Sequence, residues 1–210
     1  MMRLLVAAIF ALSLGVPALA VSAAPPAVAA ASDLQYALPE IAERFRQQSG
    51  QEIKLSFGSS GNFQTQIIQG APFELFLSAD EDYVYHLADW GLTLGRGVLY
   101  AKGRIVIYVP AGSVIDPTFD GLRAAFAEGR IAHFAIANPE HAPYGRAARE
   151  ALQSAELWPT AQRTLVLGEN VSQAAQFVFS GSAQAAIIPY SLVLAPAVAG
   201  HGKFTLIAEQ

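Results

Sequence analysis

Apolar and polar residues alternate along this chain in two different periods, and each period predicts one kind of secondary structure. Residues 52–57 place apolar side chains at every second position, which is typical of a half-buried strand. Residues 34–45 bring apolar side chains onto one face at helical spacing and charged side chains onto the other. Gly50 follows as a signal for the end of this helix.

The same alternation continues along the rest of the chain. Strands are predicted at residues 27–31, 52–57, 74–78, 104–109, 133–137, 164–167 and 185–188. Helices are predicted to begin near residues 34 and 61 and to cover residues 80–90, 119–126, 144–155 and 171–179. This alternation predicts an α/β fold with parallel sheets. A change of spacing near residues 100–103 predicts a hinge between two lobes, residues 24–102 and residues 103–210, the second including the start of a return to the first.

The first 23 residues have the layout of a secretory signal peptide. Arg3 supplies a positive charge, residues 4–14 are an almost unbroken apolar run, and small residues follow. The run is shorter than the roughly 20 residues that a membrane span needs. Cleavage is expected after Ala20 or Ala23, with Ala23 preferred. These features predict a periplasmic protein that does not insert into the membrane once the signal is removed.

Composition narrows the choice of function. With 53% hydrophobic residues the chain has enough apolar side chains for a core, and its lack of cysteine excludes disulfides and thiolate chemistry. The net charge of −4 argues against nucleic acid or an anionic membrane as a partner. It does not argue against a small anion, because backbone N–H groups and hydroxyls bind anions without positive side chains.

Four strand-to-helix turns carry the candidate binding chemistry, at residues 31–33, 58–61, 143–145 and 170–172. Ligands of parallel sheets bind at the carboxyl ends of strands, where helices begin. Each turn offers unpaired N–H groups at the positive end of a helix dipole, and serine hydroxyls are further donors. The alternative interpretation is that Ser32, Ser60 and Asn170 are ordinary helix N-caps.

Evidence for an enzyme is weaker. Glu140 and His141 are the one candidate acid/base pair, and no second cluster supports a catalytic triad or a metal bound directly by side chains. Surface or packing roles are expected for the scattered histidines His86, His133, His141 and His201.

Four segments resemble the molybdate-binding periplasmic proteins of the ModA family: residues 29–32 (AAAS), 57–62 (FGSSGN), 70–80 (GAPFELFLSAD) and 138–145 (NPEHAPYG). They occur in the family's order and extend over nearly all of the chain after the signal peptide. The resemblance implies a two-lobed type II solute-binding fold, with parallel-rich sheets, flanking helices and a cleft between the lobes. It also implies a monomer without cofactor or catalysis, which binds molybdate or tungstate and delivers it to an ABC permease in the inner membrane.

The resemblance also implies which residues bind the oxyanion. Ser32 and Ser60 would each donate through hydroxyl and backbone N–H, and Tyr144 and Val171 would donate through backbone N–H alone. Some members add a tyrosine hydroxyl from a late strand; that position falls at or near Pro189, with Tyr190 beside it.

Two departures from the family remain. Asp33 places a carboxylate beside Ser32, where it is expected to cap the helix and point away, or else to accept a proton from hydrogen phosphate. The sequence stops at Gln210, so we expect the family's C-terminal segment, which returns to the first lobe, to be missing. Alternatives that stay open are a binding protein for sulfate or phosphate, an enzyme on the same two-lobed fold such as a dehydratase, and a sensor or interaction domain.

Overall fold

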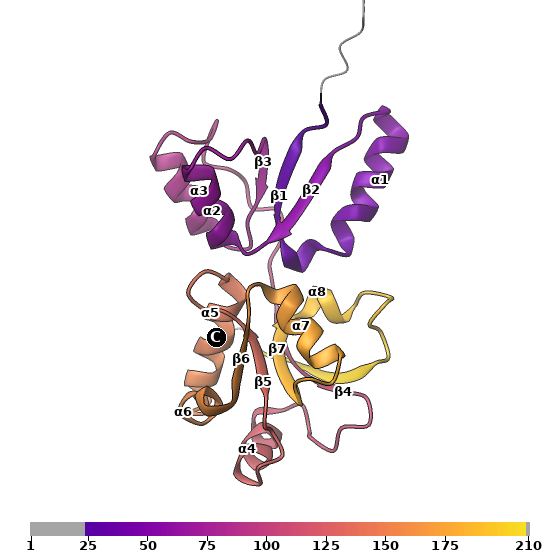
Figure 1. Ribbon diagram of the computed structural model, residues 1–210, viewed down its shortest axis with the longest axis vertical. Coiled ribbons are helices and arrows are strands. Elements are labelled where there is room, and N and C mark those ends of the chain that lie inside the picture. Colours follow the sequence, from indigo (N-terminus) through magenta and orange to yellow (C-terminus); the bar gives the residue numbers. More distant parts are fainter. Residues whose placement is uncertain (1–23, 209–210) are drawn as a thin grey trace, which may run out of the picture.

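The computed structural model describes residues 24–208, so the predicted signal peptide lies outside the described residues. Two lobes lie one above the other, each built on a β-sheet with flanking helices (Figure 1). The segment 90–104 runs from the first lobe to the second. Among residues 24–208, no helix combines the length and the apolar character needed to cross a membrane.

The first lobe contains a three-stranded parallel sheet in the order β2-β1-β3. Its strands are β1 (Ala27–Ala31), β2 (Lys54–Gly58) and β3 (Leu75–Leu77). Its helices are the short 3₁₀-helix η1 (Ser32–Leu34), α1 (Ala37–Ser49), α2 (Ser60–Ile68) and α3 (Glu81–Asp89). Helix α1 lies on one side of the strands in Figure 1, and α2 and α3 lie on the other.

Local sequence signals fix where these helices begin and end. Gly50 ends α1 in the left-handed conformation, with φ 72°, as its position in the sequence predicts. Asp80 begins α3, because its carboxylate accepts a hydrogen bond from the backbone N–H of Asp82.

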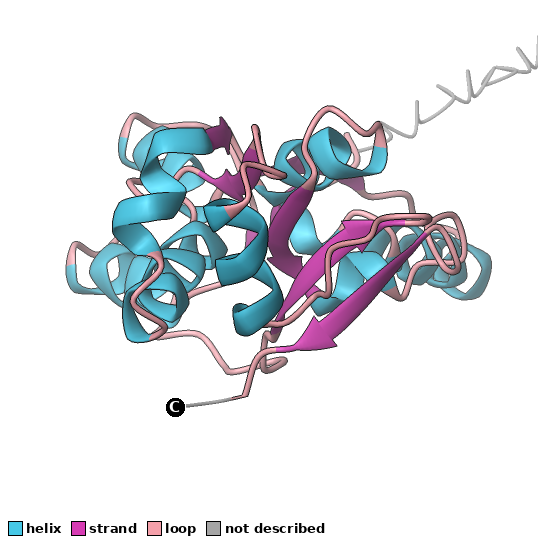
Figure 2. Ribbon diagram, turned by 90° about the horizontal axis from the view of Figure 1, so that it is seen from below, coloured by secondary structure: helices cyan, strands magenta, loops and turns pink. Residues whose placement is uncertain are grey.

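The second lobe contains a five-stranded sheet in the order β6-β5-β7-β4-β8. Its strands are β4 (Ile105–Pro110), β5 (Phe134–Ala137), β6 (Leu165–Gly168), β7 (Ala185–Pro189) and β8 (Gly202–Leu206). Its helices are α4 (Phe119–Ala127), α5 (Pro143–Ser154), α6 (Trp158–Ala161), η2 (Gln162–Thr164), α7 (Val171–Phe179) and α8 (Tyr190–Val193). Figure 2, which looks at the molecule from below, shows helices on either side of the strands.

The second sheet is mixed, whereas the alternation of elements predicted parallel sheets. Strand β5 is parallel to β6 and β7, but β4 is antiparallel to both β7 and β8. The reason is that β4 is reached by the linker from the first lobe and not by a crossover helix, so no crossover sets its direction. Strand β8 was missed because it is a short, largely exposed edge strand with a weak apolar pattern.

The buried core is unequal between the lobes. In the second lobe, two large clusters pack on the central strands β4, β5 and β7, which are buried almost throughout. In the first lobe the buried cluster consists of Val28, Ala30 and Leu38, with partly buried neighbours around it. The second lobe therefore supplies most of the hydrophobic stabilisation of the fold.

Candidate functional site

The carboxyl ends of β1 and β2 meet the beginnings of α5 and α7 at the boundary between the lobes. Ser32 follows β1, Ser60 is the first residue of α2, Tyr144 is the second of α5 and Val171 is the first of α7. All four line one small cavity of about 10 Å³, which holds about one water-sized sphere. Its full lining is Ala31, Ser32, Asp33, Gly58, Ser59, Ser60, Ala79, Ala142, Pro143, Tyr144 and Val171. The structure thus brings together turns that are far apart in the sequence.

Two serine hydroxyls face this cavity as available donors. Ser32 is 2% exposed and its Oγ has no hydrogen-bond partner. Ser60 is fully buried, and its Oγ accepts a hydrogen bond from the backbone N–H of Ala79 at 3.0 Å. Because a hydroxyl both donates and accepts, this contact leaves the Ser60 proton available for a ligand.

The N-cap interpretation of these serines is wrong for two of the three predicted caps. The cap residues of η1 and α2 are Ala31 and Ser59, and neither helix start has a side-chain cap. Only Asn170 acts as expected, because its Oδ1 accepts from the backbone N–H groups of Ser172 and Gln173. The hydroxyls of Ser32 and Ser60 are therefore not needed to start a helix.

The second lobe contributes backbone donors. Helix α5 begins with Pro143, which has no N–H, so the N–H of Tyr144 is the first of this helix. In α7, Asn170 occupies the N–H groups of the second and third residues, and the N–H of Val171 is left. The first N–H groups of a helix have no partner within it and carry the positive end of its dipole. The arrangement favours a small anion without any cationic side chain.

The close packing at the start of α5 depends on Gly145. A Cβ atom at this position would lie 2.2 Å from the carbonyl oxygen of Ala137, at the end of β5. The glycine therefore lets the helix approach the sheet closely enough to bring Tyr144 to the cavity.

Asp33 lines the same cavity, and its expected role as a helix cap is wrong. Its carboxylate makes no cap hydrogen bond; instead Oδ2 accepts from the phenol of Tyr144 at 3.0 Å, across the lobe boundary. The residue is 8% exposed, and its Oδ1 has no hydrogen-bond partner. Burial raises the pKa of Asp33 to about 6, against a smaller lowering by the Tyr144 hydrogen bond.

Pro189 and Tyr190 do not reach this cavity. Pro189 is the last residue of β7, and Tyr190 begins α8, where its ring packs against Phe204 with 5.7 Å between ring centroids. No tyrosine hydroxyl from this part of the chain lines the small cavity.

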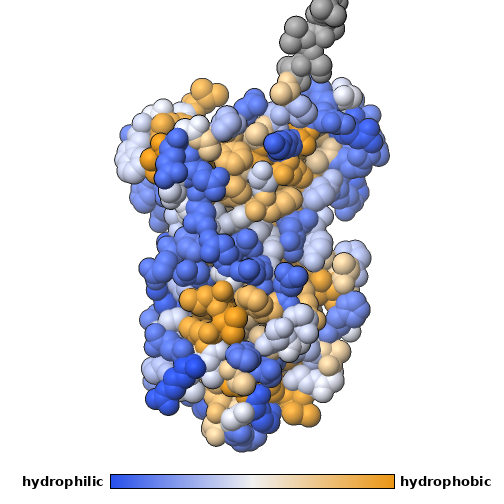
Figure 3. All heavy atoms as spheres, viewed as in Figure 1, coloured by the Kyte–Doolittle hydropathy of each residue, from blue (hydrophilic) through white to orange (hydrophobic). Residues whose placement is uncertain are grey.

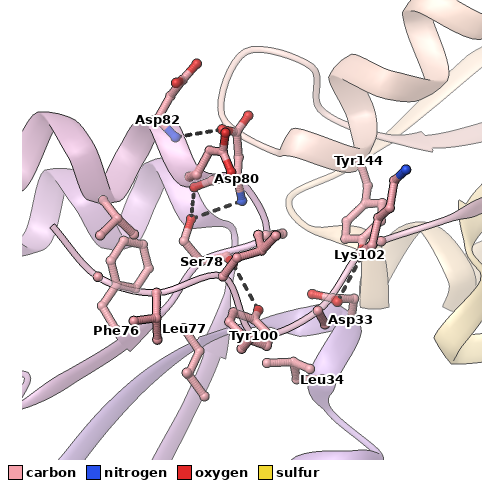
Figure 4. A pocket seen from close by; sticks show the side chains of 18 of the residues that line it. Asp33, Leu34, Phe76, Leu77, Ser78, Asp80, Asp82, Tyr100, Lys102 and Tyr144 are labelled. Carbon is pink, nitrogen blue, oxygen red and sulfur yellow. Dashed lines mark hydrogen bonds between the residues drawn. The ribbon is translucent and has the colours of Figure 1, made fainter. Parts of the chain in front are cut away.

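A second, larger hollow of about 900 Å³ lies beside the linker (Figure 4). Tyr100 of the linker donates to the carbonyl oxygen of Ser78 at 2.9 Å, and Tyr190 lies on its wall. The side chains of Leu34 and Phe76 also line it, so much of its wall is carbon. A hollow of this size and apolar lining does not surround a small ion with polar donors on all sides.

Several contacts hold the lobes together around the small cavity. Ser172 Oγ donates to the carbonyl oxygen of Ser32, and the backbone N–H of Gly61 donates to the carbonyl oxygen of His141, both at 3.0 Å. Further contacts join Asn62 to Glu169, Arg146 to Asp80, and Ser191 to the carbonyl of Asp33. In Figure 3, hydrophilic residues gather across the waist between the lobes. The lobes are therefore in contact around the small cavity.

His141 belongs to this boundary, and a mere surface or packing role does not describe it. Its Nδ1 lies 3.0 Å from Ser59 Oγ, and its Nε2 lies 3.7 Å from Glu169. Glu140 instead contacts Arg149 at 3.5 Å, so the two neighbours do not form an acid/base pair. Among residues 24–208, no group of three or more His, Cys, Asp or Glu side chains is arranged to hold a metal ion.

Comparisons of the sequence and the fold with known proteins show which family the chain belongs to. Residues 26–210 match the family model of the bacterial extracellular solute-binding proteins. The molybdate-binding protein ModA of Rhodobacter capsulatus is 36% identical over 179 residues, which cover 84% of this chain and 69% of that protein. ModA of Azotobacter vinelandii is 35% identical over 186 residues, which cover 88% of this chain and 72% of that protein. The solved periplasmic molybdate-binding protein of Azotobacter vinelandii superposes with a TM-score of 0.79 at 30% identity, over 87% of this chain and 79% of that one.

Proposed function

The chain belongs to the bacterial extracellular solute-binding proteins, and among them to the ModA family whose motifs its sequence carries; on this premise we propose that it captures molybdate for an ABC importer. The family is one of binding proteins, so the chain is not an enzyme and the oxyanion is its ligand, not a cofactor. Tungstate, with the same charge and tetrahedral shape, is the second ligand we propose.

The proposed binding shell consists of neutral donors. Ser32 and Ser60 donate through hydroxyl and backbone N–H, and Tyr144 and Val171 donate through backbone N–H. The observation that carries this proposal is the unpaired hydroxyl of Ser32, buried in a cavity where four strand-to-helix turns converge. A buried donor without a partner is costly, and an anion oxygen would satisfy it.

A shell of donors also gives a reason for selectivity. Molybdate without protons offers only acceptors, so every contact is a hydrogen bond from the protein. A protonated phosphate would leave its own O–H unpaired at a cost of roughly 1–3 kcal/mol, unless Asp33 accepted it. Sulfate carries no proton at neutral pH and differs from molybdate in size, so the fit of the cavity must reject it.

Capture requires movement of the lobes. The cavity holds about one water-sized sphere, which is less than an anion of five heavy atoms needs. We therefore propose that the lobes, residues 24–102 and 103–210, open at the linker and close on the anion by a hinge motion. We further propose that the signal peptide, residues 1–23, exports the chain to the periplasm. There the closed complex, as a monomer, would dock on the inner-membrane permease.

A panel of oxyanions tests this function. Molybdate and tungstate are expected to raise the melting temperature of the mature protein, because they bind only the folded state. Sulfate and phosphate are expected to raise it far less at the same concentration. Calorimetric titration then gives the affinities. Equal stabilisation by sulfate or phosphate would contradict the proposal.

A further inference from the structure

Among residues 24–208, Asp33 is the one acidic side chain that lines the small cavity. It is 8% exposed, one carboxylate oxygen accepts from Tyr144, and the other is buried without a partner. Ser32, the adjacent residue, also has an unpaired hydroxyl. The carboxylate of Asp33 is therefore a hydrogen-bond acceptor beside a proposed anion site whose other groups are hydrogen-bond donors.

An ionised Asp33 would oppose a dianion in this position. Like charges at short range in a poorly hydrated site repel strongly, and the usual result is that one of them takes up a proton. The titratable groups that face Asp33 do not relieve this repulsion. Tyr144 of α5 donates its hydrogen bond to Oδ2, and Tyr100 of the linker donates to Ser78. Both phenols have a raised pKa through burial and stay neutral.

The remaining neighbours are polar or lie along the linker. Ser191 of α8 donates to the backbone carbonyl of Asp33, not to its carboxylate. Lys102 and Arg104 line the larger hollow together with Asp33, and Figure 4 shows the amino group of Lys102 pointing away from it. Burial outweighs every other influence on the carboxyl group.

We propose that Asp33 is a ligand-binding residue that takes up one proton from solvent when the oxyanion binds. The proton would settle on Oδ1, and the new O–H would donate to an oxygen of the anion. Oδ2 would keep its hydrogen bond from Tyr144. The anion stays fully deprotonated and no bond to its central atom forms. This inference rests on the function proposed above and deepens it.

Linkage gives the direction of the pH dependence. The anion binds the neutral form of Asp33, so affinity is highest where Asp33 is already protonated and falls as pH rises. Since the pKa of Asp33 without ligand is about 6, the apparent affinity should fall by about tenfold per pH unit above that value. Below it, Asp33 should add no further pH dependence.

Proton counting by calorimetry tests this directly. Sodium molybdate is titrated into the mature protein at about pH 7.5, in buffers with different ionisation enthalpies, which reveals how many protons each binding event takes up. The wild type should take up close to one proton. Asp33→Asn should take up none, bind more tightly at this pH and lose the decline with pH, because its amide donates without a proton from solvent.

His141 is another ionisable side chain at the boundary between the lobes, and it supplies the control. His141→Gln should keep the proton uptake, whatever its effect on affinity. The inference is overturned if the wild type binds molybdate without proton uptake, or if the uptake survives in Asp33→Asn and disappears in His141→Gln. Failure of the wild type to bind molybdate at all would instead refute the proposed function.

Discussion

The hydroxyl of Ser172 donates a 3.0 Å hydrogen bond to the carbonyl oxygen of Ser32. Ser172 is the second residue of α7 in the second lobe, and Ser32 follows the first strand of the first lobe. Both residues adjoin the proposed anion site, so the bond joins the two halves of that site. It can form only while the lobes are together, and its strength therefore contributes to the closed state.

Removing this hydroxyl should weaken ligand binding without touching the ligand. In Ser172→Ala, the loss of one neutral hydrogen bond corresponds to about 0.5–1.5 kcal/mol, or an affinity lower by roughly two- to tenfold, mostly through faster release. Ser180→Ala, at the other end of the same helix, removes an exposed hydroxyl that bonds within its own lobe and should leave affinity unchanged. Stopped-flow measurement of molybdate release distinguishes the two.

The two site serines should differ in their effect on stability. Ser32→Ala and Ser60→Ala each remove a donor to a charged ligand, worth about 1.5–3 kcal/mol, so molybdate affinity should fall by roughly ten- to a hundredfold in both. Ser60→Ala also leaves the N–H of Ala79 without its acceptor, which should destabilise the free protein by about 1–3 kcal/mol. Ser32→Ala loses no hydrogen bond in the free protein.

Calorimetric titration of the two variants measures the loss of molybdate affinity, and chemical unfolding measures the stability of the free proteins. Ser182→Ala, which removes an exposed hydroxyl that bonds to Ser180 and does not line the cavity, serves as the matched control. Normal affinity in both site variants would remove the support for a serine-based shell.

Gly61 should be needed for closure and not for folding. A Cβ atom at this position would lie 2.7 Å from the carbonyl oxygen of His141, in the opposite lobe. Gly61→Ala should therefore hold the lobes apart and lower molybdate affinity, while the free protein unfolds near the wild-type denaturant midpoint. Gly95→Ala, where an added Cβ meets nothing within 4 Å, is the control. Small-angle scattering with saturating molybdate would report compaction in the control and less in Gly61→Ala.

Asp33 should lower the stability of the free protein at neutral pH. Its folded-state pKa of about 6 lies above the ordinary value of 3.8, so between these values the folded state binds more protons than the unfolded state. Stability should then fall as pH rises from about 4 to about 6, by roughly 3 kcal/mol, and stay lower above it. Asp33→Asn should lose this decline and be more stable than the wild type at neutral pH. Urea unfolding across this pH range measures both, and parallel profiles would contradict the prediction.

The sequence predicts the first lobe and most of the second because each element carries its own signals. The alternation in β2 and the helix stop at Gly50 are local, and the structure has both where they are expected. Strand direction is not local: β4 pairs antiparallel with β7 because of how the linker delivers it. The short α6 and α8 were missed because four residues are too few for a helical period.

The candidate site likewise has features that the sequence indicates locally and others that depend on the fold. Turns with free helix ends can be located from the sequence, and the resemblance to the ModA family implies Ser32, Ser60, Tyr144 and Val171 within them. The structure brings these four residues to one cavity. The contacts between residues of different lobes could not be predicted from the sequence. The contact of Tyr144 with Asp33 joins residues 111 apart in the chain, and nothing in either segment indicates it. The position of His141 at the lobe boundary likewise could not be predicted, because its contact with Ser59 depends on the folded structure.

The unequal hydrophobic cores predict that the two lobes differ in local stability. Val28, Ala30 and Leu38 form a small buried cluster, whereas the clusters of the second lobe are extensive. Backbone amide hydrogens of the first lobe should therefore exchange with solvent through local unfolding, whereas those of β5 and β7 should exchange only through global unfolding. Proteases should cleave the first lobe before the second. An anion bound by Ser32 and Ser60 and by the N-termini of α5 and α7 would link the less stable first lobe to the more stable second lobe. The ligand-bound protein should therefore be degraded more slowly than the free protein.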